Sequence, residues 1–228
     1  MICQGTRIVP KTGERKESRS ASFGGAIWYD RAMHNLANKL SAANIGQQLD
    51  EYVRCVEEIR FPIANAGGLR LLESLKRDKV NAGPYPSVAL FEAANRIMTD
   101  LVILYGVKWL LDKNVFPFQT YTVEFGTENN NGFDIRAENN GKILIGEAFN
   151  VAPSFFQTKK TSMLKKLRYD TQADFKLIMV NQDAVAERYN PKAEKGEYYL
   201  FVQVGSGIAN VLPSSASNGI SNTVPITV

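Results

Sequence analysis

The sequence predicts an α/β (α+β) fold in which a central sheet is flanked by helices and preceded by a helical N-terminal region. Three observations support this prediction. Apolar residues recur at helical spacing in 26–60 and again in 88–111. From 120 onward apolar and polar residues alternate as in a strand, and helical and strand patterns then follow one another to 204. With 228 residues and 44% hydrophobic content, the chain can bury a sizeable core.

The N-terminal third divides into an arm and a helical region. Residues 1–25 carry several basic side chains among Gly, Ser, Thr and Pro without an apolar period, which indicates a flexible basic arm. Residues 26–86 are expected to form a helical region, with helical periodicity over 26–60 and a short helix around 69–75, and we expect the helices of 26–60 to pack together or onto a partner subunit. Ser87 then occupies an N-cap position before a strongly apolar run, which predicts a long helix ending before Asn114.

A hairpin is the most specific prediction for the second half of the chain. Asn140-Gly141 separates two apolar-rich runs, 133–137 and 143–149, and both central residues of a type I′ turn need positive φ. The other elements expected here are a strand over 121–125, a helix over 153–169, two buried strands over 175–180 and 198–204, and a Ser- and Asn-rich tail over 213–228.

The register of this hairpin brings two acidic residues together. If Asn139 pairs with Lys142, Asp134 lies directly opposite Glu147, where Cβ atoms of an antiparallel pair are only ~4.5 to 5.5 Å apart. Like charges at this distance repel, and a divalent cation such as Mg²⁺ turns the repulsion into ligation. The alternative is that both carboxylates reach solvent, and a register error of one residue would separate them.

Composition excludes several kinds of site. The single histidine, His34, excludes a multi-histidine metal site and is expected to be a surface or packing residue. Cys3 and Cys55 have no neighbours at metal-ligand spacing. Because no window approaches ~18 apolar residues and no signal-peptide pattern occurs, we expect a cytoplasmic protein without a membrane partner. A net charge of +4 permits a nucleic-acid partner without establishing one.

The order of long helix, strand, Asp-bearing strand, hairpin, Glu-bearing strand, helix and strand resembles the core of the PD-(D/E)xK nucleases, which include many type II restriction endonucleases. The resemblance covers about residues 87 to 204 and implies a restriction-endonuclease-like core with a mixed sheet over 87–212. Its motif residues are Gly132-Phe133-Asp134 and Ile145-Gly146-Glu147, so that Asp134 and Glu147 match the two family carboxylates. The family usually has lysine two positions later, where this chain has Phe149.

The resemblance also implies that the missing cation comes from elsewhere, since some members carry this lysine on the following helix. Lys160 is the candidate, because it lies within the apolar stripe of the helix expected over 153–169. Lys159 is the neighbouring possibility, whereas Lys165 and Lys166 are expected on the solvated face. On this interpretation Asp134, Glu147 and Lys160 are the catalytic residues.

The resemblance suggests further acidic candidates, and a basic run beside the expected site suggests residues that contact DNA. Glu92 would join Asp134 and Glu147 as a metal ligand, although the helix macrodipole explains an early Glu equally well, and Glu124 is a weaker candidate of the same kind. The residues expected to contact DNA phosphates are Lys159, Lys165, Lys166 and Arg168, a set that an ordinary solvated helix face would also produce.

These features predict a Mg²⁺-dependent endonuclease that hydrolyses double-stranded DNA, of the type II restriction kind, acting as a homodimer whose 26–86 region serves dimerisation or DNA contact. A first alternative is a catalytically inactive DNA-binding or structural protein with the nuclease fold, which Phe149 favours. A second is a small-molecule enzyme in which Asp134 and Glu147 perform acid–base chemistry.

Overall fold

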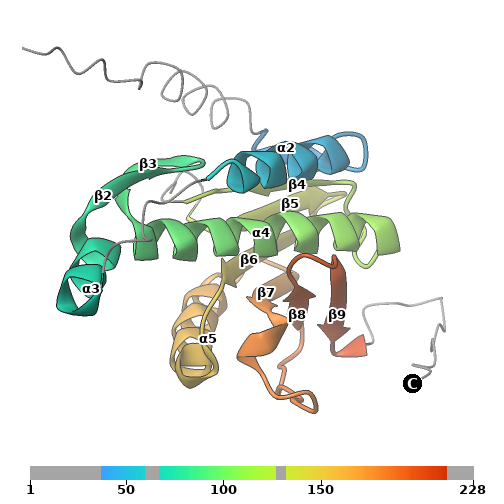
Figure 1. Cartoon of the computed structure of the whole chain (residues 1–228). Helices are drawn as coiled ribbons and strands as arrows, with labels where there is room; N and C mark the ends of the chain where they lie inside the picture. Colours follow the sequence, from blue (N-terminus) through green and yellow to red (C-terminus); the bar gives the residue numbers. More distant parts are fainter. Residues whose placement is uncertain (1–36, 60–66, 127–131, 215–228) are drawn as a thin grey trace, which may run out of the picture.

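A seven-stranded mixed sheet is the centre of the computed structural model, which describes residues 37–59, 67–126 and 132–214 (Figure 1). In spatial order its strands are β1 (Lys39–Ser41), β4 (Thr120–Val123), β5 (Ile135–Asn139), β6 (Lys142–Phe149), β7 (Phe175–Asn181), β8 (Glu197–Gln203) and β9 (Ile208–Leu212). The helices are α2 (Ile45–Glu57), α3 (Gly68–Arg77), α4 (Leu90–Lys113) and α5 (Pro153–Tyr169), with a 3-10 turn η1 (Gln182–Ala184). The α/β (α+β) class and the mixed sheet flanked by helices are confirmed.

The sheet combines an antiparallel half with a parallel centre. Strands β4, β5 and β6 form an antiparallel meander, and β1 pairs antiparallel with the other edge of β4. Helix α5 then connects β6 to β7, which is parallel to β6 as β8 is to β7, and β9 returns antiparallel to β8. The β6–α5–β7 crossover places the beginning of α5 beside the end of β6.

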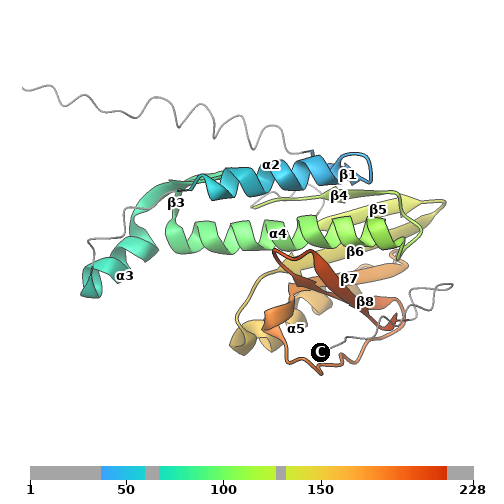
Figure 2. The ribbon, with the colours of Figure 1, turned by 45° about the vertical axis from the view of Figure 1, so that its right-hand side comes forward.

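Helices cover both faces of the sheet. Leu144 and Ala148 of β6 belong to the core that contains α2 and α4, whereas Ile145 and Phe149 belong to the core that contains α5. Figure 2 shows α2 and α4 running side by side, with α5 on the other side of the sheet. The backbone of α4 approaches the sheet closely at Gly106, where a Cβ atom would lie 2.7 Å from the sulfur of Met179.

Parts of the expected helical region 26–86 form strands instead. Lys39–Ser41 is strand β1, and the segment before α4 is a separate hairpin of β2 (Lys79–Ala82) and β3 (Tyr85–Ala89). Ser87 is therefore not the N-cap: it lies in β3 with φ 57°, and Ala89 precedes the first helical residue. These strands are too short for their alternation to stand out from a helical pattern. Strand β9 was likewise not expected from the sequence.

Several sequence predictions concern residues outside the described ranges. The basic arm 1–25, the helical segment 26–36 with His34, and residues 215–228 of the expected tail belong to this group. Within the described ranges, none of the helices has both the length and the apolarity needed to cross a membrane.

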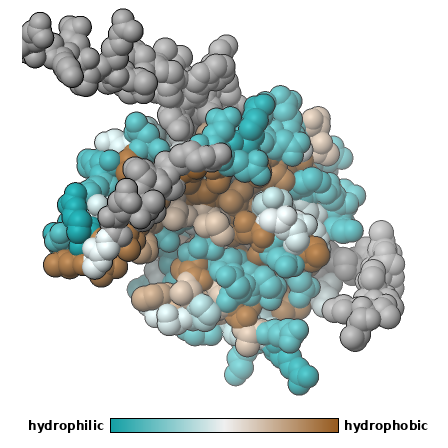
Figure 3. All heavy atoms as spheres, in the orientation of Figure 1, coloured by the Kyte–Doolittle hydropathy of each residue, from teal (hydrophilic) through white to brown (hydrophobic). Residues whose placement is uncertain are grey.

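Helix α3 lies beside the β2–β3 hairpin at one end of the molecule and buries none of its residues. Leu69 and Leu72 are 72% and 58% exposed, and Figure 3 shows hydrophobic surface at this end. In contrast to α3, α2 buries its apolar side: Ile45, Leu49 and Tyr52 lie in the core that α2 shares with α4.

The beginnings of the three central strands are held together around Asp174. Its backbone N–H donates to the carbonyl of Ile143, and its carboxylate accepts the N–H of Ile143 at 2.9 Å. The carbonyl of Gly196, just before β8, accepts the N–H of Lys176 at 2.7 Å. Gly196 has φ 82°, and a Cβ atom there would lie 2.7 Å from the carbonyl oxygen of Asp174. This contact leaves no room for a side chain at 196.

We expect Gly196→Ala to lower the free energy of unfolding by about 1 to 3 kcal/mol more than Gly205→Ala, measured by urea denaturation. Both glycines have positive φ, but nothing lies within 4 Å of a Cβ atom at 205. The difference therefore reports the collision with the backbone of Asp174, and equal losses for the two variants would contradict it.

Candidate active site

The hairpin register agrees with the sequence prediction over the whole of β5. Asn139 pairs with Lys142 and Ile135 pairs with Gly146, so Asp134 and Glu147 each follow the last of these pairs by one residue. Asp134 lies just before β5, and its Oδ2 accepts the backbone N–H of Ala148 at 2.8 Å. The bond holds the Asp134 carboxylate against β6 at the residue next to Glu147.

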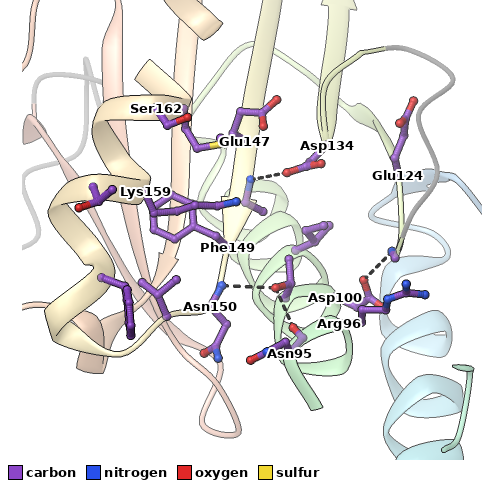
Figure 4. A pocket seen from close by; sticks show the side chains of 18 residues that line it. Asn95, Arg96, Asp100, Glu124, Asp134, Glu147, Phe149, Asn150, Lys159 and Ser162 are labelled. Carbon is purple, nitrogen blue, oxygen red and sulfur yellow. Dashed lines mark hydrogen bonds between the residues drawn. The ribbon is translucent and has the colours of Figure 1, made fainter. Parts of the chain in front are cut away.

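The two acidic residues lie in a cavity of about 720 Å³ between α4, the end of β6 and the first turns of α5 (Figure 4). Glu147 and Asp134 lie at one end of the cavity in this view, and Asn95 and Asn150 lie at the other. Its wall also includes Arg96, Thr99, Asp100, Glu124, Phe149, Phe155, Lys159 and Ser162. Four acidic side chains therefore face one concave surface together with two basic ones.

Burial and the charge of neighbouring acids raise the pKa values of the carboxyl pair. Glu147 is 3% exposed, and burial together with the charge of Asp134 raises its pKa to about 7, although a hydrogen bond and the charge of Lys166 oppose the rise. Burial also raises the pKa of Asp134, against the lowering effects of the Ala148 N–H and of nearby lysines. Both acids are thus easier to protonate than free carboxyl groups.

Lys166 supplies the cation next to Glu147. Its Nζ lies 2.6 Å from Glu147 Oε1 and 5.4 Å from the ring centroid of Phe133. The sequence placed Lys166 on the solvated face, and its side chain is indeed 45% exposed, but its ammonium group reaches back to the carboxylate. The spacing in the sequence could have indicated this position, because Lys166 lies two helical turns after the candidate Lys159 and therefore on the same side of α5.

Lys160 does not reach the carboxylates. Its Nζ donates to the hydroxyl of Tyr189 at 2.9 Å and lies 5.6 Å from the ring centroids of both Tyr189 and Phe156. The residue does lie on the partly buried side of α5, as its spacing indicated. That side of α5 faces the segment after η1. The positive charge expected from Lys160 near the carboxyl pair is supplied instead by Lys159 and Lys166, on the adjacent side of the helix.

The other basic candidates on α5 divide into two groups. Lys159 lines the cavity and extends toward β6 in Figure 4, and its charge lowers the pKa of both Asp134 and Glu147. Arg168 instead donates to both oxygens of the buried Glu197, at 2.6 and 3.0 Å. Lys165 is exposed and lies outside the cavity wall.

The acidic candidates before the hairpin also differ in position. Glu92 is about half-exposed, pairs with Arg96 one turn later, and does not line the cavity. Glu124 is 4% exposed and lines the cavity, and its backbone N–H donates to the carbonyl of Asp134 at 2.9 Å. Glu124, the weaker candidate from the sequence, therefore lies in the cavity with Asp134 and Glu147, and Glu92 does not.

Asp100 was not singled out from the sequence. This α4 residue is 1% exposed and lines the cavity, and burial raises its pKa to about 6. Its carboxylate accepts hydrogen bonds from the hydroxyls of Tyr52 and Tyr85 and, at 3.2 Å, from the N–H of Gly126. Its partners lie in α2, β3 and the segment after β4, which no local pattern brings together.

Phe149 occupies the position at which the resembled family has its lysine. The side chain is 3% exposed and packs on Phe156 of α5, with ring centroids 6.4 Å apart. It lies on the same face of β6 as Glu147, as the alternation predicted. An aromatic ring therefore fills this place, and positive charge reaches the pair from Lys166 and Lys159 instead.

The carboxyl pair fits a hard divalent cation that is completed by substrate oxygens. Mg²⁺ is commonly held by one or two carboxylates plus phosphate and water oxygens, and two adjacent carboxyl groups with raised pKa values lose repulsion when a cation binds between them. Within the described ranges, no three His, Cys, Asp or Glu side chains are grouped closely enough to hold a metal ion. The protein alone thus offers a two-carboxylate site.

Comparison of the chain with protein-family models, with curated proteins and with solved structures found no match. The interpretation of this cavity therefore depends on its geometry and chemistry.

We expect Glu147→Gln to stabilise the protein at pH 8 by on the order of 2 kcal/mol, or roughly 4 to 8 °C in Tm, and much less at pH 5. The folded-state pKa of about 7 exceeds the ordinary 4.5, so this carboxyl favours folding fully below about pH 4.5 and loses that contribution as the pH rises through 7. The amide that replaces it stays neutral at both pH values.

Differential scanning fluorimetry at the two pH values measures this effect. Glu138→Gln is the matched control, because Glu138 belongs to the same hairpin but is 63% exposed. A Tm change for Glu147→Gln that is the same at pH 5 and pH 8 would contradict the expected pKa.

Proposed function

We propose that the chain is a Mg²⁺-dependent DNA endonuclease related to the PD-(D/E)xK nucleases, with Asp134 and Glu147 as its metal ligands. The observation that carries the proposal is the hairpin register, which places both acids in one cavity with Lys166 bonded to the second. The order of α4, the β4–β5–β6 meander, α5 and β7 supports it.

The roles of the chain's own groups follow from their positions. Asp134 is held in place by the Ala148 N–H, and Glu147 is kept partly ionised by Lys166, as metal ligation requires. Lys159 lies on the cavity wall, where its ammonium group can neutralise charge on the scissile phosphate. When bound, Mg²⁺ would supply a bound water of lowered pKa and charge neutralisation at the phosphate.

A homodimer of the restriction type, acting in the cytoplasm on double-stranded DNA, is the assembly that we propose for this activity. Two equivalent sites are the simplest way to cut both strands of a symmetric sequence. Light scattering of the purified chain tests the dimer.

A second candidate function keeps the fold without the reaction. It is favoured by Phe149, whose buried ring occupies the place of the motif lysine. In that case the protein would bind DNA, and the carboxyl pair would not contribute to cleavage.

Plasmid DNA incubated with the protein and Mg²⁺ should be cut into discrete fragments, and Asp134→Asn or Glu147→Gln should lower the rate roughly 100-fold or more. The loss is expected because each substitution removes a charged metal ligand. Lys160→Ala should change the rate little, since its ammonium group bonds Tyr189. Binding of DNA without cleavage in Mg²⁺ would favour the inactive alternative, and failure to bind DNA would favour a small-molecule enzyme.

At Mg²⁺ concentrations too low to saturate the site, the cleavage rate should rise with pH as the metal-free Glu147 ionises, with a midpoint near its pKa of about 7. Lys166→Ala should move this midpoint upward by about one pH unit, because Lys166 lowers the pKa of Glu147 through a hydrogen bond and its charge. Cleavage rates from pH 5.5 to 9 measure the shift. Lys165→Ala is the control on the exposed side of α5, and the midpoint should be unchanged. A lower rate with an unmoved midpoint would contradict the role given to Lys166.

A further inference from the structure

The cavity extends well beyond the carboxyl pair. Its volume of about 720 Å³ lies within the range of roughly 300 to 1,000 Å³ that organic ligands occupy. A phosphate and its cation would use the end formed by Asp134 and Glu147. The opposite end, near Asn95 and Asn150, is left for another part of the substrate (Figure 4).

The chemistry of this second end differs from that of the first. Apolar side chains on the cavity wall include Val151, which follows Asn150, and Phe155, which is 65% exposed. Asn95 of α4 and Asn150 after β6 contribute side-chain amides, which can both donate and accept hydrogen bonds. Flat apolar faces and edges of mixed donors and acceptors are the matching features of a nucleobase.

Residues close together in the chain contribute to both ends of the cavity. Asn150 comes directly after β6, and its backbone N–H donates to Thr99 of α4, so this residue is tied to both the sheet and the helix. Phe155 lies in the first turn of α5, one turn before Lys159, which reaches toward the carboxyl pair. A ligand extending from the acidic end to Phe155 would span a phosphate and its attached base.

We propose that this cavity binds one unpaired nucleotide next to the scissile phosphate, with its base on Phe155 and its edge toward Asn95 and Asn150. The proposal rests on the nuclease function and narrows its substrate. A base that is paired and stacked in a duplex cannot enter a cavity, so the nucleotide must be extruded or already unpaired. A duplex substrate must pay for extruding this nucleotide, so a duplex in which it is already unpaired in a bulge, or a single strand, is bound more tightly than a perfect duplex.

Fluorescence anisotropy with three labelled oligonucleotides tests this: a perfect duplex, the same duplex with a one-nucleotide bulge, and the single strand. The carboxyl pair is left unsubstituted and Ca²⁺ replaces Mg²⁺, so that a divalent cation can occupy the acidic end while cleavage is suppressed. We expect the bulged duplex and the single strand to bind at least about 5-fold more tightly than the perfect duplex. Phe155→Ala should weaken both by roughly 5- to 150-fold, the usual contribution of one stacked base, and Phe155→Tyr should restore them.

Tyr169→Ala is the matched control, because Tyr169 is an aromatic residue of the same helix that is 92% exposed and lies outside the cavity wall. Equal binding of the three oligonucleotides, no binding of any, or equal effects of Phe155→Ala and Tyr169→Ala would each overturn the proposal. Cleavage by the unsubstituted protein separates the two proposals. If Phe155→Ala weakens binding but the unsubstituted protein does not cleave DNA in Mg²⁺, the nucleotide site is retained and the nuclease function is rejected. If the unsubstituted protein cleaves DNA but Phe155→Ala does not weaken binding, the nuclease function is retained and the nucleotide site is rejected.

Discussion

Two carboxyl groups held close together where water has limited access impose the main constraint on this structure. The repulsion between Asp134 and Glu147, and the loss of their hydration, must be offset locally. The Ala148 N–H and the Lys166 ammonium group do so in part, and the raised pKa values show that the compensation is incomplete. Because the negative charge of the pair is only partly compensated by the protein, the site favours the binding of a cation.

The local part of this arrangement could be predicted from the sequence. Asn140 and Gly141 both have positive φ, at 50° and 72°, as the turn requires, and the register follows from them. The short strands β1 and β9 could not be predicted in this way, because each is defined by a partner elsewhere in the chain. Three to five residues carry too little alternation to be recognised alone.

The choice of lysine shows a second limit of prediction from sequence. Periodicity identified the partly buried side of α5 and placed Lys160 on it. It could not give the rotation of α5 relative to the sheet, which decides whether that side meets the carboxyl pair or Tyr189. The flexible stem of Lys166 adds to the difficulty, because an exposed backbone position still allows the ammonium group to reach Glu147. Asp100 could not be predicted for a similar reason, because its hydrogen-bond partners Tyr52 and Tyr85 come from distant parts of the chain.

Asp100 joins α2 and β3 to the cavity wall through Tyr52 and Tyr85. A fragment beginning at 87, the expected start of the nuclease-like core, would leave this buried carboxyl without either phenol. It would also uncover the edge of β4 that β1 now pairs with, and such an edge is a template for aggregation. A fragment that keeps these contacts begins no later than Lys39, because the segment before α4 supplies β1, Tyr52 and Tyr85.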